Sequence, residues 1–230
     1  MMRARSNYSC QWALGNEFQS FRPERRWPVG TATAANTLEM LRTTLSVARS
    51  GRVRGPCGCG RFSLYGATVI IRDAVEDDWP SIYPFFSEIV AAGRTYAYPE
   101  NLSINDARSY WMTGPPGRTV VALDSDVVAG TATMGPNRPG RGSHIATASF
   151  IVDPRQQSRG VGRALGNEVI DWARREGYRG IQFNAVVETN EAAVHLWKSL
   201  GFDVLATVPE AFDHAERGFV GLHVMYRRLS

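Results

Sequence analysis

One run in the second half of the chain, residues 148–165, constrains the fold more than any other. It reads ASFIVDPRQQSRGVGRAL: an apolar stretch typical of a buried strand, a proline-led turn, and glycines at the start of an amphipathic helix. The first turn of such a helix has backbone N–H groups without intrahelical partners, at the positive end of the helix dipole. The run therefore predicts a strand–turn–helix unit with a phosphate-type anion site at the helix start.

The spacing of the glycines limits which anion site this is. No G-x-x-x-x-G-K-[ST] pattern is present, which excludes a P-loop. Gly160, Gly162 and Gly166 match a loose G-x-G-x-x-x-G that a dinucleotide-binding fold could use. That fold places its glycines directly after the first strand of the domain, whereas seven residues including Pro154 separate strand from glycines here. The pattern that fits is Gln157-x-x-Gly160-x-Gly162.

Charge and cysteine are concentrated in the first 66 residues. This segment holds ten Arg and three Glu, a net of +7, whereas residues 67–230 hold sixteen Lys and Arg against nineteen Asp and Glu, a net of −3. The mildly acidic remainder makes nucleic acid an unexpected partner. Cys10, Cys57 and Cys59 all lie in the basic segment, and one C-x-C without a second pair does not make a metal site. We therefore expect no metal.

The basic segment 1–66 shows no sustained strand alternation, and three interpretations of it stay open. It is a disordered basic extension, residues encoded upstream of the true start, or an Arg-rich transit peptide. No apolar run approaches the roughly 18 residues of a membrane span, and no signal peptide opens the chain. We expect a cytoplasmic protein without a membrane partner, whose globular domain covers residues 67–230.

The strand and helix patterns of residues 67–230 predict an α/β fold with the order βααβββαβαββ, in which seven strands form a mostly antiparallel sheet with four helices. Ser103 or Asn105 is expected to cap the second helix, and Thr189 the fourth. The expected strands are 67–72, 119–123, 127–134, 145–152, 181–187, 202–208 and 220–229, and the expected helices are about 80–92, 103–112, 161–176 and 189–200.

A second motif accompanies the glycine run. Residues 187–202 read VETNEAAVHLWKSLGF, which is similar to the N-x-x-A-x-x-L-[YF]-x-x-x-G-F segment of the Gcn5-related N-acetyltransferases (GNAT superfamily). The Gln157-x-x-Gly160-x-Gly162 pattern matches the acetyl-CoA motif of the same family. With the element order, the resemblance covers residues 67–230. It implies an enzyme, an acetyl-CoA-dependent N-acetyltransferase.

The resemblance implies a role for each part of the cofactor site. Pyrophosphate would be held at the helix start, and the pantetheine arm would pair with the backbone of the strand before it. In this family the two central strands splay apart, and Asn190 would contact the cofactor from the other side of the gap between them. Trp197 stands where the family often has a Tyr that acts as general acid. The expected cofactor residues are Ile151, Val152, Gln157, Arg159, Gly160, Val161, Gly162, Arg163, Ala164, Asn190 and Trp197.

The expected chemistry is direct attack of an amine on the thioester, which requires removal of a proton from the amine. Glu100, Glu188 and Tyr96 are the candidate bases. The alternatives are a charge favourable to a helix dipole for Glu188, and a solvated loop for Glu100 and Tyr96. Asn is disfavoured in the middle of a strand, so Asn184 requires an explanation. Its segment resembles the corresponding segment of the fungal N-acetyltransferases that act on proline analogues, in which this Asn faces the acceptor. The alternative is a satisfied structural Asn.

The acceptor is expected to be the amine of a small or amino-acid-like molecule, because the loop 95–100 is aromatic and poor in charge. The alternatives are acetylation of a protein lysine or N-terminus, and a CoA-binding regulatory module without catalysis. We assign no catalytic role to His144, His195, His214 or His223. A homodimer is compatible with the sequence.

Overall fold

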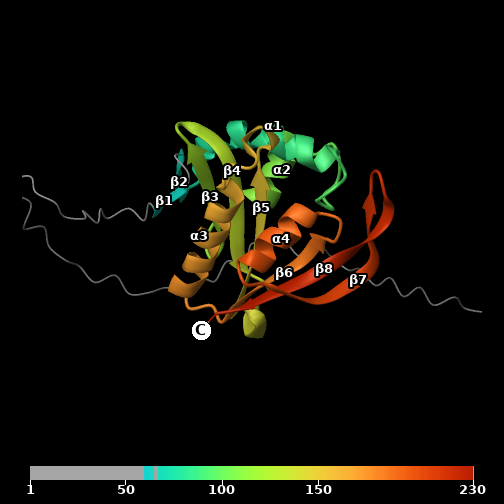
Figure 1. Ribbon diagram of the computed structural model, residues 1–230. Coiled ribbons are helices and arrows are strands. Elements are labelled where there is room, and N and C mark those ends of the chain that lie inside the picture. The colour runs from blue at the N-terminus through green and yellow to red at the C-terminus, as the bar shows by residue number, and fades with distance from the viewer. Residues whose placement is uncertain (1–59, 65–66, 230) are drawn as a thin grey trace, which may run out of the picture. The chain divides into compact units, whose positions relative to one another are not determined.

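The computed structural model describes residues 60–64 and 67–229, and these form one mixed sheet with helices on both faces (Figure 1). The sheet has eight strands in the order β1-β2-β3-β4-β5-β6-β8-β7. Every neighbouring pair is antiparallel except β5–β6. In this part of the chain, no helix is long and apolar enough to cross a membrane.

All seven predicted strands are present, and the sheet carries an eighth. The additional strand, β1, lies at residues 60–64, within the segment that we expected to be an extension, and pairs with β2. Predictions for Cys10, Cys57, Cys59 and the rest of residues 1–59 lie outside the described residues. The strands are β1 Gly60–Leu64, β2 Ala67–Asp73, β3 Arg118–Asp124, β4 Val127–Pro136, β5 Ile145–Val152, β6 Gly180–Val187, β7 Asp203–His214 and β8 Gly218–Arg228.

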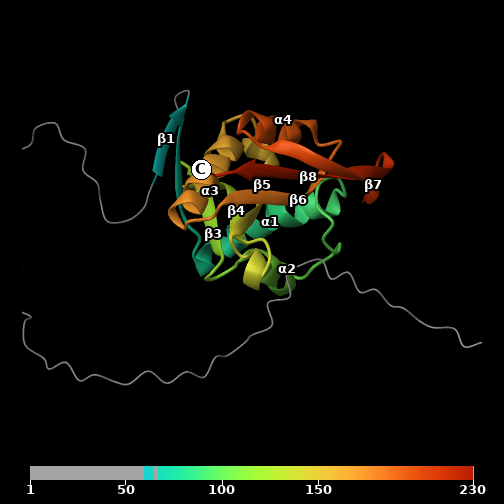
Figure 2. The same cartoon turned by 90° about the horizontal axis from the view of Figure 1, so that it is seen from below.

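Four α-helices cover the sheet, α1 and α2 on one face and α3 and α4 on the other (Figure 2). Ser103 caps α2, since its Oγ accepts from the Asp106 N–H at 3.2 Å. Asn190, not Thr189 as predicted, caps α4 by accepting from the Ala193 N–H at 3.2 Å. The helices are α1 Trp79–Ala91, α2 Ile104–Trp111, α3 Val161–Arg175 and α4 Glu191–Ser199.

Each face of the sheet has its own core. Alternation along the strands divides their apolar side chains between the two. On the α1/α2 face, Phe85, Phe86 and Trp111 are fully buried against β3 and β5. On the α3/α4 face, Leu165 and Val169 pack against the central strands. Helices on both faces explain why β3 is a continuous apolar run.

The parallel pair β5–β6 separates soon after it begins. Only Ile145↔Gly180 and Ala146↔Ile181 are paired, at the amino-terminal ends of the two strands. The α3 helix makes the crossover between them. Beyond residue 146, β5 therefore has one edge that no strand covers within the described residues, and this edge faces the gap toward β6.

Candidate functional site

The amino-terminal end of α3 lies above the separated strands. Gly160 precedes the helix in a left-handed conformation, with φ of +79°, and no side chain caps the first turn. The first intrahelical bond of the turn runs from the Ala164 N–H to the Gly160 C=O at 2.9 Å. The amides of Val161, Gly162 and Arg163 precede it and are left for a ligand. A Cβ on Gly160 would meet open space.

Side chains around this turn fit an anion. Arg159 and Arg163 flank the first residues of α3 in sequence. Arg159 pairs with Asp124 of β3 at 2.7 Å, and Arg163 donates to Ser199 of α4 at 2.9 Å. Gln157 is exposed. The neighbouring Gln156 has a buried Oε1 without a hydrogen-bond partner among the described residues. An uncapped helix start with fixed cations is the arrangement that holds phosphate.

Gly162 and Gly166 serve a second purpose, which is close packing of α3 on α4. A Cβ on Gly166 would lie 2.6 Å from Leu200 Cδ1, and one on Gly162 would lie 3.3 Å from Leu196 Cδ2. Both distances are shorter than ordinary contacts. The glycines thus bring Asn190, at the start of α4, toward the same gap as the start of α3.

The register of β4 and β5 decides which β5 backbone groups face the gap. The Asp153 N–H donates to the Ala129 C=O at 3.0 Å. Because bonding residues alternate along an antiparallel pair, Ile151 also turns its N–H and C=O toward β4. Phe150 and Val152 turn theirs toward β6. The free edge thus contains the backbone groups of Phe150 and Val152. Of the two predicted residues, Val152 lies on this edge, whereas Ile151 turns its backbone toward β4 and buries its side chain in the α1/α2 core.

Tyr96 reaches this edge from the loop between α1 and α2. Its hydroxyl donates to the Phe150 C=O at 2.6 Å and accepts from the Phe150 N–H at 3.0 Å. Burial raises the pKa of the Tyr96 phenol well above its usual value, and the neighbouring Tyr98 adds to the shift. A phenol of this kind stays protonated at neutral pH, which makes Tyr96 unsuitable as a base.

Trp197 fills the α3/α4 side of the gap. It is 6% exposed, and its ring centroid lies 4.5 Å from that of Phe150 on β5 and 5.0 Å from that of Phe183 on β6. The indole therefore bridges the two strands where they separate. Its contacts are those of a core residue that forms the floor of the gap.

The remaining candidates lie on opposite faces of the sheet. Asn184 and Gln182 lie on the α1/α2 side. Gln182 Nε2 donates to Asn184 Oδ1 at 2.8 Å, and Asn184 Nδ2 donates to Asn137 Oδ1 at 2.7 Å. Glu188 accepts from the Gly221 N–H, and its carboxylate lies over Gly221, on the same face of β8 as the core residue Met225. Glu188 is thus directed away from the α1/α2 side and held in a structural bond.

Two cavities lie between the loop after α1 and the end of the β7–β8 hairpin, two segments that Figure 1 shows close together. The Ala215 N–H donates to the Gly93 C=O at 3.0 Å and joins them. Glu100 lines one cavity, of about 220 Å³, with Tyr96, Tyr98 and Asp213 among its neighbours.

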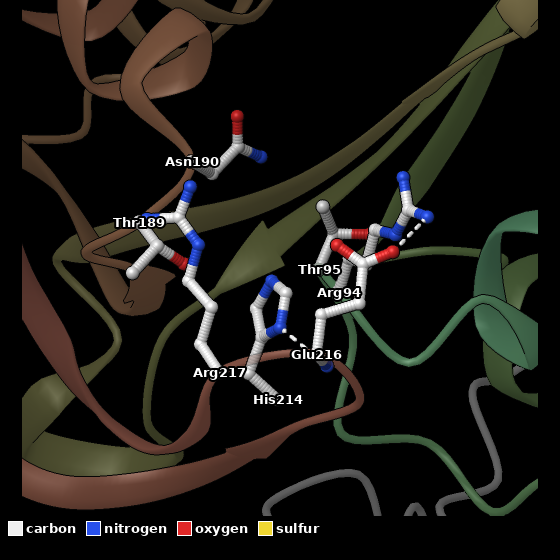
Figure 3. A pocket seen from close by; sticks show the side chains of 7 residues that line it. All are labelled: Arg94, Thr95, Thr189, Asn190, His214, Glu216 and Arg217. Carbon is white, nitrogen blue, oxygen red and sulfur yellow. Dashed lines mark hydrogen bonds and ion pairs between the residues drawn. The ribbon is translucent and has the colours of Figure 1, made fainter.

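The other cavity, of about 240 Å³, is strongly polar (Figure 3). Arg94 pairs there with Glu216, while His214 is 6% exposed and accepts from the Glu216 N–H at 3.1 Å through Nδ1. Thr189 has a buried Oγ1 without a partner among the described residues. The lining residues are Arg94, Thr95, Thr189, Asn190, His214, Glu216 and Arg217.

Sequence reasoning missed Phe150 and the charged residues of this cavity. We expected β7 to end at Val208, so His214 and Arg217 were left in a connection without a predicted place. The strand continues to His214 across an irregularity near residues 208–212. A His followed three residues later by Arg in a tight turn was the signal available. This pattern indicates a binding site only once the structure shows that the turn lies next to residues 94 and 95.

Comparisons with known proteins agree with this geometry. Residues 72–202 match the Acetyltransferase (GNAT) family. The structure of a GCN5-related N-acetyltransferase from Kribbella flavida is 61% identical, with a TM-score of 0.68, and the match covers 70% of this chain and 98% of that chain.

Two further relatives bear on the ligands. The yncA protein of Salmonella typhimurium, solved with its cofactor acetyl-CoA, is 26% identical with a TM-score of 0.63, covering 70% of this chain and 94% of that one. The L-amino acid N-acyltransferase MnaT of Escherichia coli K12 is 36% identical over 92 residues. That alignment spans 40% of this chain and 53% of MnaT, about half of the relative's length.

Proposed function

Because the chain belongs to the acetyltransferase (GNAT) family, we propose that it transfers the acetyl group of acetyl-CoA to the amine of a small, amino-acid-like acceptor. Two observations support the cosubstrate: the uncapped start of α3 with its flanking arginines, and a relative solved with acetyl-CoA. The acceptor class is supported by the likeness to an L-amino acid N-acyltransferase and by cavities of a size suited to small molecules.

The residues at the start of α3 hold the pyrophosphate. The amides of Val161, Gly162 and Arg163 bind its oxygens, and the guanidinium group of Arg163 balances part of its charge, while Arg159, already paired with Asp124, adds a further donor. Gln157, which follows the short helix 154–156, and Ala164, in the first turn of α3, lie on either side of these amides in sequence. The free β5 edge at Val152 pairs with the pantetheine arm as an added strand would, and Asn190 meets the arm from α4.

The cosubstrate supplies an activated acyl carbon, at which the acceptor nitrogen forms a C–N bond as the C–S bond breaks. The Phe150 N–H faces the gap and can polarise the carbonyl oxygen once the Tyr96 hydroxyl releases it. A thiolate leaves without a strong acid, since thiols ionise near pH 8.5. The absence of a Tyr at Trp197 is therefore compatible with catalysis.

The proton of the acceptor amine goes to a carboxylate or water on the α1/α2 side. Glu188 is on the other side of the sheet and Tyr96 stays protonated, so Glu100 is the remaining base of the three predicted candidates. Asn184, whose carboxamide already joins Gln182 and Asn137, orients the acceptor from β6.

The test measures binding first and turnover second. Calorimetric titration with acetyl-CoA should give saturable binding, and thiol release should then depend on added amine in a panel of free amino acids and amines. A matched panel of peptides with free lysine or a free N-terminus tests the protein-acetylating alternative. Acetyl-CoA binding with no turnover on either panel would instead favour a regulatory CoA-binding module.

A further inference from the structure

The cavity between the two loops contains more hydrogen-bond donors than the protein uses. Arg94 is already neutralised by Glu216, but Arg217 has no carboxylate partner among the described residues. Since His214 Nδ1 accepts a backbone N–H, the hydrogen of the neutral ring is on Nε2. The Thr189 hydroxyl is buried and unpartnered. The cavity thus offers three donors and one uncompensated positive charge.

The location of this cavity relates it to the acetyl site. Asn190, which lines it, is the residue that we assign to the pantetheine arm, and Thr95 on the opposite side immediately precedes Tyr96. Tyr96 in turn bonds the free β5 edge at Phe150. In Figure 3, Arg217 extends beside Thr189 toward Asn190, with the His214 ring between Arg217 and Thr95. An anion held here would lie next to the gap on the side of the acceptor loops.

We propose that this cavity binds the carboxylate of the acceptor, with Arg217 as the charged contact and His214 and Thr189 as further donors. The inference rests on the proposed function and narrows it to acceptors that carry a free carboxylate near the reacting amine. A planar guanidinium matches the two oxygens of a carboxylate, and a buried unpaired hydroxyl gains a partner when an oxygen arrives. Phosphate of CoA is the other anion of similar chemistry, and the experiment separates the two.

The experiment compares each acid with its own carboxamide. Methionine, proline, alanine and phenylalanine are assayed at pH 8 against their primary amides by thiol release at saturating acetyl-CoA. Chemistry alone favours the amide at pH 8, because loss of the carboxylate lowers the pKa of the amine and leaves a larger fraction of it unprotonated. We expect kcat/KM of wild type to be at least tenfold higher for the best acid than for its amide.

Arg217→Gln should lower kcat/KM for that acid at least tenfold while leaving the amide and the KM of acetyl-CoA within twofold. Arg228→Gln removes the same charge from the exposed far end of β8 and should change neither. Arg217 is exposed in a turn, and melting curves of both variants check the fold.

Equal wild-type rates for acid and amide would overturn the proposal, as would equal losses for both in Arg217→Gln. A change confined to the KM of acetyl-CoA would assign the cavity to a CoA phosphate. If no amine is turned over, the proposed function fails, and the inference is then decided by calorimetry. CoA-saturated wild type should bind the acid form, and Arg217→Gln should bind it at least tenfold more weakly.

Discussion

The start of α3 and the polar cavity are both anion sites in our interpretation, but they are built differently. At α3 the binding groups are backbone amides of three consecutive residues, and the glycines beside them keep side chains away. The cavity is lined by side chains from three segments far apart in sequence, at residues 94–95, 189–190 and 214–217, and the proposed binding groups are the side chains of Thr189, His214 and Arg217. The first site is local and suits a ligand shared by a whole family. The second can change residue by residue, as acceptor choice requires.

The largest effect is expected when a negative charge is placed at the start of α3. Gly160→Asp should weaken acetyl-CoA binding about a hundredfold, because like charges side by side cost several kcal/mol. Gly160→Asn is the matched control: it has the same shape, tolerates the left-handed conformation and adds no charge. Titration calorimetry of both variants decides the matter. Equal acetyl-CoA affinities for the Asp and Asn variants would contradict the binding of phosphate at the start of α3.

A tenfold effect is expected on the acceptor side of the comparison. Asn184→Ala should lower kcat/KM for the best acceptor at least tenfold, with an unchanged KM for acetyl-CoA and no fall in melting temperature, because Asn184 is exposed. Gln182→Ala removes its neighbour on the same face and should have a smaller effect. Unchanged kinetics for Asn184→Ala would return this residue to a purely structural role.

Tyr96→Phe probes the link between the two sites. Loss of the hydroxyl removes the hydrogen-bond partner of the Phe150 N–H and C=O. We expect urea unfolding to show a free energy of unfolding lower by about 1 kcal/mol. The folded-state pKa of Tyr96 lies above its unfolded value, so its stabilisation is complete below about pH 10 and is lost as the pH rises further. Wild type should therefore lose stability above about pH 10 more steeply than Tyr96→Phe. Parallel curves would contradict this account.

The smallest effect is predicted for Glu188. Its carboxylate holds the Gly221 N–H on the α3/α4 face, so Glu188→Gln, which keeps an accepting oxygen, should leave kcat/KM and its pH dependence within twofold. Glu100→Gln is the comparison variant, because Glu100 lies on the acceptor side, and about a threefold to tenfold loss is expected there. A large loss for Glu188→Gln alone would reverse our assignment of the base.

The α/β fold and the family were predictable because their signals are local. The seven strands, the four helices and the family assignment are confirmed. Where the prediction was incomplete, tertiary structure overrides local pattern. β1 forms in an Arg-rich segment because β2 offers it an edge, and β7 passes Pro209 because an edge strand loses no ladder bond at proline.

The features of the site also divide into those that follow from local sequence and those that depend on tertiary structure. The start of α3 follows from glycine spacing, whereas the exchange of Ile151 for Phe150 at the free edge required the β4–β5 register. The capping of α4 by Asn190 instead of Thr189 differs by one residue, yet it leaves the Thr189 hydroxyl unpartnered in the cavity. Arg94 and Arg217 are 123 positions apart, and no spacing rule connects them.

The contact between Gly93 and Ala215 has a mechanical consequence. Strands β1–β5 and strands β6, β8 and β7 form two halves of the sheet, which pair directly only at residues 145–146 and 180–181 among the described residues. The Gly93–Ala215 bond adds a second connection, between the loop after α1 and the β7–β8 hairpin. A Cβ on Gly93, at φ of +60°, would lie 3.0 Å from the Ala215 Cβ and would push the loop and the hairpin apart. The absence of a side chain at Gly93, outside both sites, therefore allows the loop after α1 and the β7–β8 hairpin to approach this closely.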